Sequence, residues 1–479
     1  MRPSRAKSFA IVPTRGSKAY YSATAWGVRN DEASLSAKCG MHRECVAMLK
    51  RILIGLAAVA IVGLGCFAAL AWQSPISPIA PPAKASFSPV LITRGEVLAG
   101  AGYCATCHTS KGGRPYAGGY AMNTGFGKIY STNITPDPET GIGSWSEEAF
   151  RRAMHEGVAR DGTHLFPAFP YDHFTKLTDG DVSALYAYVM TREPVRASIP
   201  ANTVPFPLNI RALQAGWKLL FFRPGRYHGR ADRGPEWNRG AYLAEGLSHC
   251  GACHTPRNML GAEKSGHSFA GAVIDNWVAP PLTKENPSPT PWSEEELAAY
   301  LRSGVSRLHG TASGPMSPVV HDGLAKLNVS DINALATYFA DVGDAAARAK
   351  ETEAAIREAL AASRHGIGLQ YDPAARLYTA ACGSCHYNGG ETVNPLRPDL
   401  ALNSAVNLSD PTNLIHVMLD GIAAAEGAPG IVMPGFASGL SDADIAGIAA
   451  YLRATRTSRT AWPDLENKVA AIRAEHEGR

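Results

Sequence analysis

Charge and spare cysteine are both scarce in this chain of 479 residues. Asp, Glu, Lys and Arg together make up 18% of it, and its net charge is +4. The basic residues are scattered rather than aligned in a stripe, which argues against a nucleic-acid partner. The sequence also lacks any pattern resembling a nucleophile with its base, and Gly100-Ala101-Gly102 has neither the strand nor the later glycine of a dinucleotide site. We therefore expect no nucleic-acid binding and no substrate chemistry on this chain.

The nine cysteines leave none over for a disulfide beyond the first apolar segment. Cys39, Cys45 and Cys66 lie before or inside that segment, and the other six form three copies of Cys-x-x-Cys-His. This pentapeptide is the attachment signature of c-type haem, in which both thiols bond to the porphyrin and the histidine binds the iron. A zinc ribbon would need a second Cys or His pair near each copy, and none is present. We predict three covalently attached haem c groups, with iron, at the attachment cysteines Cys104, Cys107, Cys250, Cys253, Cys382 and Cys385 and the proximal histidines His108, His254 and His386.

The compartment follows from that chemistry, because haem of this kind is attached on the outer face of the bacterial cytoplasmic membrane. Residues 52–72 form an uncharged, mostly apolar run of 21 residues, long enough to cross a bilayer. Lys50 and Arg51, directly before it, favour a cytoplasmic N-terminal side. The run could be a signal peptide cleaved after Ala71 or an uncleaved anchor, and its length favours the anchor. We therefore expect the protein in the cytoplasmic membrane, on the periplasmic side.

Sequence features around each haem motif recur in the same order, which indicates a repeated domain. An Arg-Gly pair precedes the first two motifs at 94–95 and 239–240, and a weaker version of this stretch lies at 376–380. Small residues there predict a close crossing by a later helix that carries core tyrosines. The signals that start the middle helices are Ser146, Ser293 and 410–413, and the glycines that end them are Gly157, Gly304 and Gly421. This order resembles the class I cytochrome c fold.

We therefore predict an all-α chain with three tandem class I cytochrome c domains after an N-terminal transmembrane or signal segment. The predicted segments are an N-terminal extension or mis-called start at 1–47, the anchor or signal peptide at 48–73, a Pro-rich tether at 74–90, domain 1 at 91–200, an apolar linker at 201–232, domain 2 at 233–345, a helical spacer at 346–370, domain 3 at 371–456 and a tail at 457–479. The linker is unusually apolar around 217–222. It could pack against its own domains, or it could form a docking surface for a partner subunit or the membrane.

A methionine sulfur on the other side of the iron would complete the coordination of an electron-transfer haem. Met316 and Met433 occupy matching loops before the closing helices, and we predict both as iron ligands. The first repeat has Phe169 at this place, and phenylalanine cannot bind iron. The sixth ligand of the first haem must come from elsewhere or be absent. Nearby candidates are Met122, Met154, His164 and His173.

Three further stretches, 130–143, 164–171 and 253–257, resemble signatures of the three-haem cytochrome subunits of membrane-bound bacterial dehydrogenases. The resemblance covers about 90–456 and implies a subunit that takes electrons from a periplasmic oxidising subunit and passes them to ubiquinone or a terminal acceptor. It implies one of two partners. One is a pyrroloquinoline-quinone alcohol dehydrogenase, and the other is a molybdenum hydroxylase with an iron–sulfur subunit, oxidising aldehydes or N-heteroaromatics such as nicotinate or isoquinoline. Phe169, the sequence Cys385-His386-Tyr387-Asn388 and the apparent anchor look more like the molybdenum type, which we favour.

The expected function is outer-sphere electron transfer by an oxidoreductase subunit of the respiratory chain. Two other interpretations predict different results. An enzyme that uses an open first haem, for example with peroxidase-like activity, would bind carbon monoxide or cyanide rapidly at one haem. A freely diffusing multihaem shuttle would have a cleaved signal and no co-purifying partner.

Overall fold

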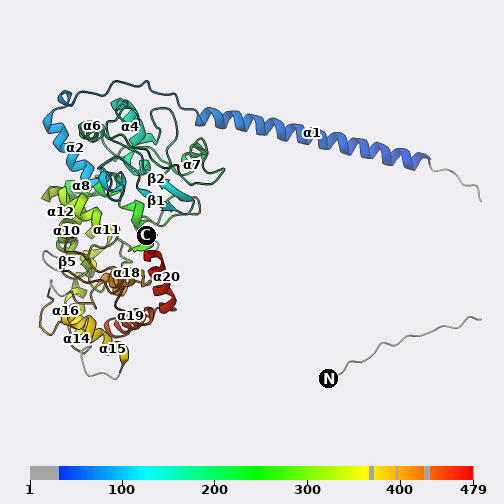
Figure 1. Cartoon of the computed structure of the whole chain (residues 1–479). Coiled ribbons are helices and arrows are strands. Elements are labelled where there is room, and N and C mark those ends of the chain that lie inside the picture. The colour runs from blue at the N-terminus through cyan, green and yellow to red at the C-terminus, as the bar shows by residue number, and fades with distance from the viewer. Residues whose placement is uncertain (1–31, 366–371, 395–397, 426–431, 478–479) are drawn as a thin grey trace, which may run out of the picture. The chain divides into compact units, whose positions relative to one another are not determined.

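The computed structural model describes residues 32–365, 372–394, 398–425 and 432–477 (Figure 1). Residues 1–31 of the predicted N-terminal extension therefore lie outside the described residues. The chain divides into two compact units, 1–68 and 69–479, and all three Cys-x-x-Cys-His motifs lie in the second unit.

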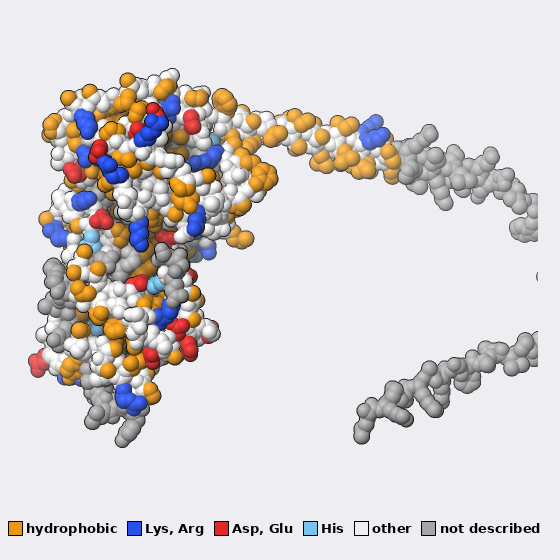
Figure 2. All heavy atoms as spheres, viewed as in Figure 1, with side chains coloured by type: hydrophobic (Ala, Val, Ile, Leu, Met, Phe, Trp, Pro, Cys, Tyr) orange, Lys and Arg blue, Asp and Glu red, His pale blue; other side chains and the backbone are white. Residues whose placement is uncertain are grey.

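Helix α1 spans Glu32–Ala71 and forms the described part of the first unit. Its segment Cys45–Ala71 is long and apolar enough to cross a membrane. Figure 2 shows hydrophobic side chains along this helix, and Val59 and Ile61 are each 71% exposed. An apolar surface of this length is stable in lipid rather than in water. The helix could therefore anchor the protein, and a signal sequence near the N-terminus can meet the same minimum length and hydropathy.

In the second unit, a helix before each haem motif is crossed by a later helix. The helices before the motifs are α2 (Pro89–Ala101), α8 (Pro235–Tyr242), continued by the π-helical turn η2 (Leu243–Leu247), and α15 (Pro373–Ala381). Each of the three α-helices has proline in its first turn, where the missing N–H costs no helical hydrogen bond. The crossing helices are α6 (Asp179–Met190), α12 (Val329–Val342) and α19 (Asp442–Arg456).

Two glycines allow the first two crossings to be close. A Cβ atom on Gly95 would lie 2.0 Å from the backbone oxygen of Ala184, and one on Gly240 would lie 1.9 Å from that of Ala334. The arginine before each glycine pairs with an aspartate of the crossing helix, Arg94 with Asp181 and Arg239 with Asp331. The close crossing predicted from the Arg-Gly repeat is confirmed, and the tyrosines of these helices are buried as predicted.

The middle helices are α4 (Glu147–Glu156), α10 (Glu294–Ser303) and α18 (Thr412–Asp420). The hydroxyls of Ser146 and Ser293 accept hydrogen bonds from backbone N–H groups of the first turn, which confirms the predicted helix starts. Gly157 and Gly304 end the first two helices in the left-handed conformation, with φ of 64° and 77°. The third helix ends at Gly421, also as predicted.

The described residues also contain short antiparallel strand pairs, so the fold departs slightly from the all-α prediction. The pairs are β1 (Ala121–Thr124) with β2 (Gly127–Tyr130), β3 (Ala272–Ile274) with β4 (Trp277–Ala279), and β5 (Val305–Ser306) with β6 (Gly310–Thr311). Their registers place Ala121 opposite Tyr130, Ala272 opposite Ala279, and Val305 opposite Thr311. Strands of two to four residues are too short for an alternating pattern to reveal them in the sequence.

The remaining elements lie within the repeats, between them and in the tail. The short ones are η1 (Lys84–Ser86), α3 (Cys104–Cys107), α5 (Tyr171–Phe174), α9 (Gly251–His254), α11 (Met316–Pro318), η3 (Val319–Gly323), η4 (Leu324–Lys326), α13 (Ala345–Arg348), η5 (Ala349–Glu351), α16 (Gly383–His386) and α17 (Ser404–Asn407). The longer ones are α7 (Leu213–Phe221), α14 (Thr352–His365) and α20 (Leu465–Glu477). Helix α20 lies in the tail, where no element was expected from the sequence, and it packs against α18 and α19.

The apolar core joins the first two repeats and leaves the third with its own. One cluster of buried side chains runs from Leu98 to Ala345 and contains residues of both α6 and α12. A second cluster contains α15, α18 and α19 residues together with Val469 and Ile472 of α20. The segment before α2 also lies against the first repeat, because the N–H of Ile76 donates to the carbonyl of Arg160 at 2.8 Å.

Candidate haem sites

Each Cys-x-x-Cys-His motif folds as a single helical turn, in α3, α9 and α16. The N–H of the motif histidine donates to the carbonyl of the first cysteine at 2.9 Å in the first motif and at 3.0 Å in the other two. Residues three and four apart lie on the same side of a helix. The turn therefore presents both thiols and the imidazole of each motif toward one side.

The residue before each of the first two motifs has a left-handed backbone, with φ of 54° at Tyr103 and 33° at His249. Residues other than glycine rarely adopt this conformation, and its cost is tolerated where the surrounding structure imposes it. Here it turns the chain sharply from the preceding helix into the motif. The two rings also meet edge to face, with centroids 5.1 Å apart. The first two motifs therefore begin next to each other.

A backbone carbonyl orients each motif histidine. The Nδ1 atoms of His108 and His254 lie 2.7 Å from the carbonyl oxygens of Thr132 and Pro280, and that of His386 lies 3.2 Å from the oxygen of Pro398. Because a carbonyl only accepts, Nδ1 must carry the proton, which leaves the lone pair on Nε2. Burial lowers the pKa of all three histidines and so favours the neutral ring. A neutral imidazole whose other N–H is held in this way fits the role of an iron ligand.

The six motif thiols are free of disulfides. Burial raises the pKa of Cys104 and Cys250 to about 12 and that of Cys107 and Cys253 to about 11. Burial likewise raises the pKa of Cys382 to about 11. Their pairing within one helical turn fits covalent attachment to haem.

A continuous cavity of about 2000 Å³ passes all three motifs. The cysteine pairs and histidines of the three motifs line it, together with many aromatic and aliphatic side chains. Pockets for a single small ligand usually measure roughly 300–1,000 Å³. A cavity of this volume, with the side chains of three Cys-x-x-Cys-His motifs on its wall, fits more than one porphyrin.

The predicted methionines lie on the same wall. Met316 begins α11, and Met433 pairs with Ile422 through two backbone hydrogen bonds of 2.9 and 3.1 Å. This pairing requires a glycine next to Ile422. A Cβ atom on Gly421, where φ is 75°, would lie 2.2 Å from the carbonyl oxygen of Met433.

The candidates for the first haem separate into two groups. Met122 and Met154 line the cavity, whereas His164 and His173 are absent from its lining. Both ring nitrogens of each histidine have other partners. His164 contacts the carbonyl of Ala71 and the Lys218 amine, and His173 contacts the carbonyl of Glu245 and the carboxylate of Glu263. Among these four candidates, the geometry therefore favours Met122 or Met154 over His164 or His173.

Sequence reasoning missed His309, a buried residue of the cavity wall that stacks on Trp292 at 3.8 Å. Its Nε2 donates to the carbonyl of Pro291, while its Nδ1 is buried without a hydrogen-bond partner among the described residues. The sequence signal was weak, because His309 lies outside every haem motif.

By contrast, the stretch 130–143 has a clear role. It contains Thr132, whose carbonyl holds His108, and Asn133, which fixes the loop by donating to the carbonyl of Val195.

Two family models match the chain. The model described as cytochrome c matches residues 92–193, and the model described as cytochrome C oxidase, cbb3-type, subunit III matches residues 370–452. With the fold and the motif geometry, these matches define a protein with cytochrome c domains, which carry covalently attached haem c.

Relatives cover most of the chain. A fructose dehydrogenase cytochrome subunit from Gluconobacter japonicus is 38% identical over 392 residues, which cover 78% of this chain and 80% of the relative. The cytochrome c subunit of a quinone alcohol dehydrogenase from Gluconobacter oxydans is 37% identical, covering 76% of this chain and 78% of the relative. A nicotinate dehydrogenase subunit from Pseudomonas putida is 47% identical over 423 residues, which cover 88% of this chain but 35% of that protein, so the chain spans about a third of its length. This chain belongs to the family of cytochrome c subunits of dehydrogenases.

Proposed function

We propose that this chain is a three-haem electron-transfer subunit, which carries electrons from a periplasmic dehydrogenase to ubiquinone or another acceptor of the respiratory chain. The observation that carries the proposal is the single cavity lined by all three haem motifs. The repeated order of helices supports cytochrome c domains at 91–200, 233–345 and 371–456. Electrons would move along this cavity without substrate chemistry on the chain.

Haem, when bound, supplies a one-electron change between ferric and ferrous iron. The protein contributes attachment through the six cysteines and ligation by His108, His254 and His386, each held by its backbone carbonyl. Met316 and Met433 would be the ligands on the opposite side for the second and third haems. The apolar wall limits water around the irons, which tunes their reduction potentials. A methionine ligand raises the potential relative to a second histidine.

The partner we favour is a molybdenum hydroxylase with its iron–sulfur subunit. The nicotinate dehydrogenase subunit is 47% identical to this chain, whereas the quinone alcohol dehydrogenase cytochrome subunits are 35–37% identical. The alternative is a quinoprotein alcohol dehydrogenase partner. The fructose and gluconate dehydrogenase cytochrome subunits are each 38% identical to this chain. They add further dehydrogenases to the two classes of electron-donating partner that the sequence motifs suggest.

An apolar surface around α7 is our candidate docking face for that partner. Leu219 and Leu220 are 64% and 58% exposed, while Trp217 of the same helix packs against Tyr171. The Trp217 indole donates to the carbonyl of Leu260, which links α7 to a second exposed apolar loop. Leu220 and Leu260 both line the haem cavity. Docking here would bring a donor close to the cavity edge.

The ligand assignment is tested with Met316→Leu and Met433→Leu in the haem-loaded protein. We expect each variant to lower the midpoint potential of one haem and leave the others near their original values. Unchanged potentials in both variants would show that neither methionine binds the iron. Slow or absent binding of carbon monoxide at all three haems would exclude an open first site.

The partner assignment is tested by purifying the complex from its native membrane. We expect a molybdenum-containing subunit and an iron–sulfur subunit to co-purify with the chain. Leu219→Glu combined with Leu220→Glu should release them, whereas Val329→Glu, at an exposed position on α12, should not. A co-purifying quinoprotein would establish the alternative, and a chain recovered alone after wild-type purification would contradict both.

A further inference from the structure

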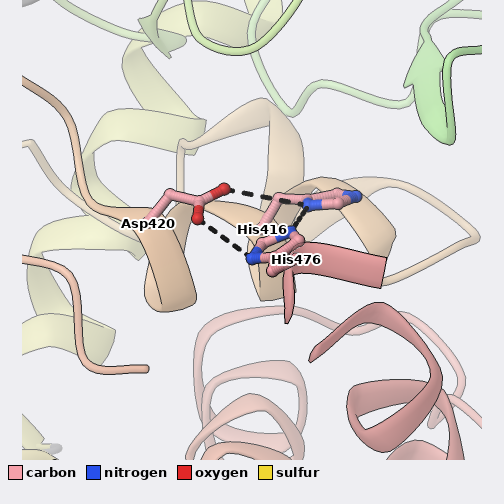
Figure 3. Close-up of side chains that lie close together, drawn as sticks. All are labelled: His416, Asp420 and His476. Atoms are coloured by element: carbon pink, nitrogen blue, oxygen red, sulfur yellow. Dashed lines mark hydrogen bonds and ion pairs between the residues drawn. The ribbon is translucent and has the colours of Figure 1, made fainter. Parts of the chain in front are cut away.

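A second group of donor side chains lies outside the haem cavity. His416 and Asp420 are one helical turn apart on α18, and His476 faces them from the last turn of α20 (Figure 3). The Nδ1 of His416 lies 2.9 Å from the Nε2 of His476 and 4.0 Å from an oxygen of Asp420. The other oxygen of Asp420 lies 3.0 Å from the Nδ1 of His476. The three side chains, from two helices, therefore face one another.

We propose that His416, Asp420 and His476 form a binding site for a divalent transition-metal ion of the zinc type, separate from the haem irons. Zinc ligands lie about 2.0–2.1 Å from the ion in a tetrahedron, which puts them roughly 3.3 Å from one another. One donor atom from each of the three residues lies within 4.8 Å of the other two, so small side-chain movements would bring all three to that spacing. Two imidazoles with one carboxylate suit zinc and similar ions, whereas magnesium and calcium prefer oxygen donors alone.

The surroundings have the features that support a metal-binding histidine. The Nε2 of His416 donates to the carbonyl of Asn276 at 3.1 Å, which fixes the ring and leaves Nδ1 as the donor to an ion. The indole of Trp277 stacks on the same ring, with centroids 4.5 Å apart and planes at 12°. The His416 side chain is therefore held on two sides before any ion arrives.

The site is also accessible. The His416 side chain is 1% exposed, that of His476 is 17% exposed and that of Asp420 is 53% exposed. An ion can therefore enter past Asp420, and a water molecule on that side can complete the coordination. His476 lies in the last turn of α20 and is more exposed than His416, so its ring has more room to move.

Because His416 lies on α18 and His476 on α20, a divalent ion bound to both would join the two helices.

A second cluster, Asp172, His173 and Glu263, does not qualify on the same criteria. Both nitrogens of His173 face acceptors, the carbonyl of Glu245 at 2.8 Å and the carboxylate of Glu263 at 2.8 Å. Both therefore donate, and no lone pair is left for an ion.

The test measures zinc in the full, haem-loaded chain after equilibrium dialysis at micromolar zinc and excess magnesium, with the protein concentration measured in the same sample to count chains. We expect one tightly held zinc per wild-type chain. His476→Ala should abolish it, and Asp420→Asn should weaken it about 10- to 100-fold. His267→Ala removes an exposed histidine elsewhere and should leave zinc binding unchanged.

Zinc should also raise the unfolding temperature of the wild type and of His267→Ala, but not that of His476→Ala. The visible haem spectrum of each variant confirms that it has folded. The proposal is overturned if the wild type retains no more zinc than His476→Ala, or if magnesium displaces the zinc. Because haem loading is the starting condition, this outcome is independent of the partner and of the iron ligands.

Discussion

Replacing Gly240 with alanine would put a methyl carbon 1.9 Å from the backbone oxygen of Ala334, where α8 crosses α12. Overpacking of this kind usually costs about 1–3 kcal/mol, and we expect about 3 because the obstacle is backbone rather than a flexible side chain. Alanine restores about 1 kcal/mol through its higher helix propensity. The net loss is therefore about 2 kcal/mol. Since the first two repeats share one core, this corresponds to a fall of roughly 4–8 °C in unfolding temperature.

The matched control is Gly180→Ala in α6, where a new Cβ meets nothing within 4 Å. There the propensity gain is unopposed, so this variant should unfold at or slightly above the wild-type temperature. Gly95→Ala should repeat the loss, because its Cβ would lie 2.0 Å from the oxygen of Ala184. The assay follows far-UV circular dichroism and haem absorbance of the loaded protein during heating. If Gly240→Ala unfolds at or above the temperature of Gly180→Ala, the close crossing is not the reason for glycine.

Three other predictions address the iron ligand, the pH response and the N-terminal segment. Gly421→Ala should displace Met433 and lower the potential of one haem in redox titration, whereas Gly439→Ala, with open space around it, should not. Burial lowers the pKa of His155 to about 4, whereas its pKa in the unfolded chain is about 6.5. Between pH values of about 4 and about 6.5, the unfolded chain therefore binds a proton that the folded chain does not. Stability in chemical denaturation should therefore fall as the pH drops through this window, and less so in His155→Gln. Mass spectrometry of membrane-purified protein should find the segment before Trp72 retained.

Each of these has a clear contrary result. Equal haem potentials in the Gly421 and Gly439 variants would show that Met433 does not bind the iron. An identical pH response in wild type and His155→Gln would assign the acid sensitivity to other groups, such as His249, whose pKa burial also lowers to about 4. A mature chain beginning at Trp72 would make α1 a cleaved signal.

Local patterns made much of the fold predictable. Ser146 and Gly157 mark the ends of α4 through caps that involve residues a few positions away. Gly95 and Gly240 indicated a close crossing, because glycine destabilises a helix and a glycine repeated inside one usually has a packing reason. The haem motifs were clear for the same reason, since their donors lie within five consecutive residues. Helix α20 was missed, because its buried Val469 and Ile472 form too short an apolar pattern to stand out.

Contacts between repeats could not be predicted, because they join residues far apart in sequence. Asn413 of α18 exchanges two hydrogen bonds of 2.8 Å with the backbone of Val278 in β4. Nothing in either stretch alone indicates the other. For the same reason, the sequence did not reveal that the three Cys-x-x-Cys-His motifs line one cavity, although each motif could be located separately.

The proposed metal site shows why these long-range contacts bear on function. His416 and His476 are 60 residues apart and belong to no haem motif, yet the fold brings their rings together. Trp277 stacks on His416 with one face and also lines the haem cavity. An ion bound to His416 would therefore fix a side chain in the cavity wall as well as the joint between the second and third repeats. Zinc binding should accordingly shift the potential of a neighbouring haem in wild type and leave it unchanged in His476→Ala. If zinc leaves the haem potential unchanged in both proteins, the ion would only link α18 to α20 and would not affect the haem.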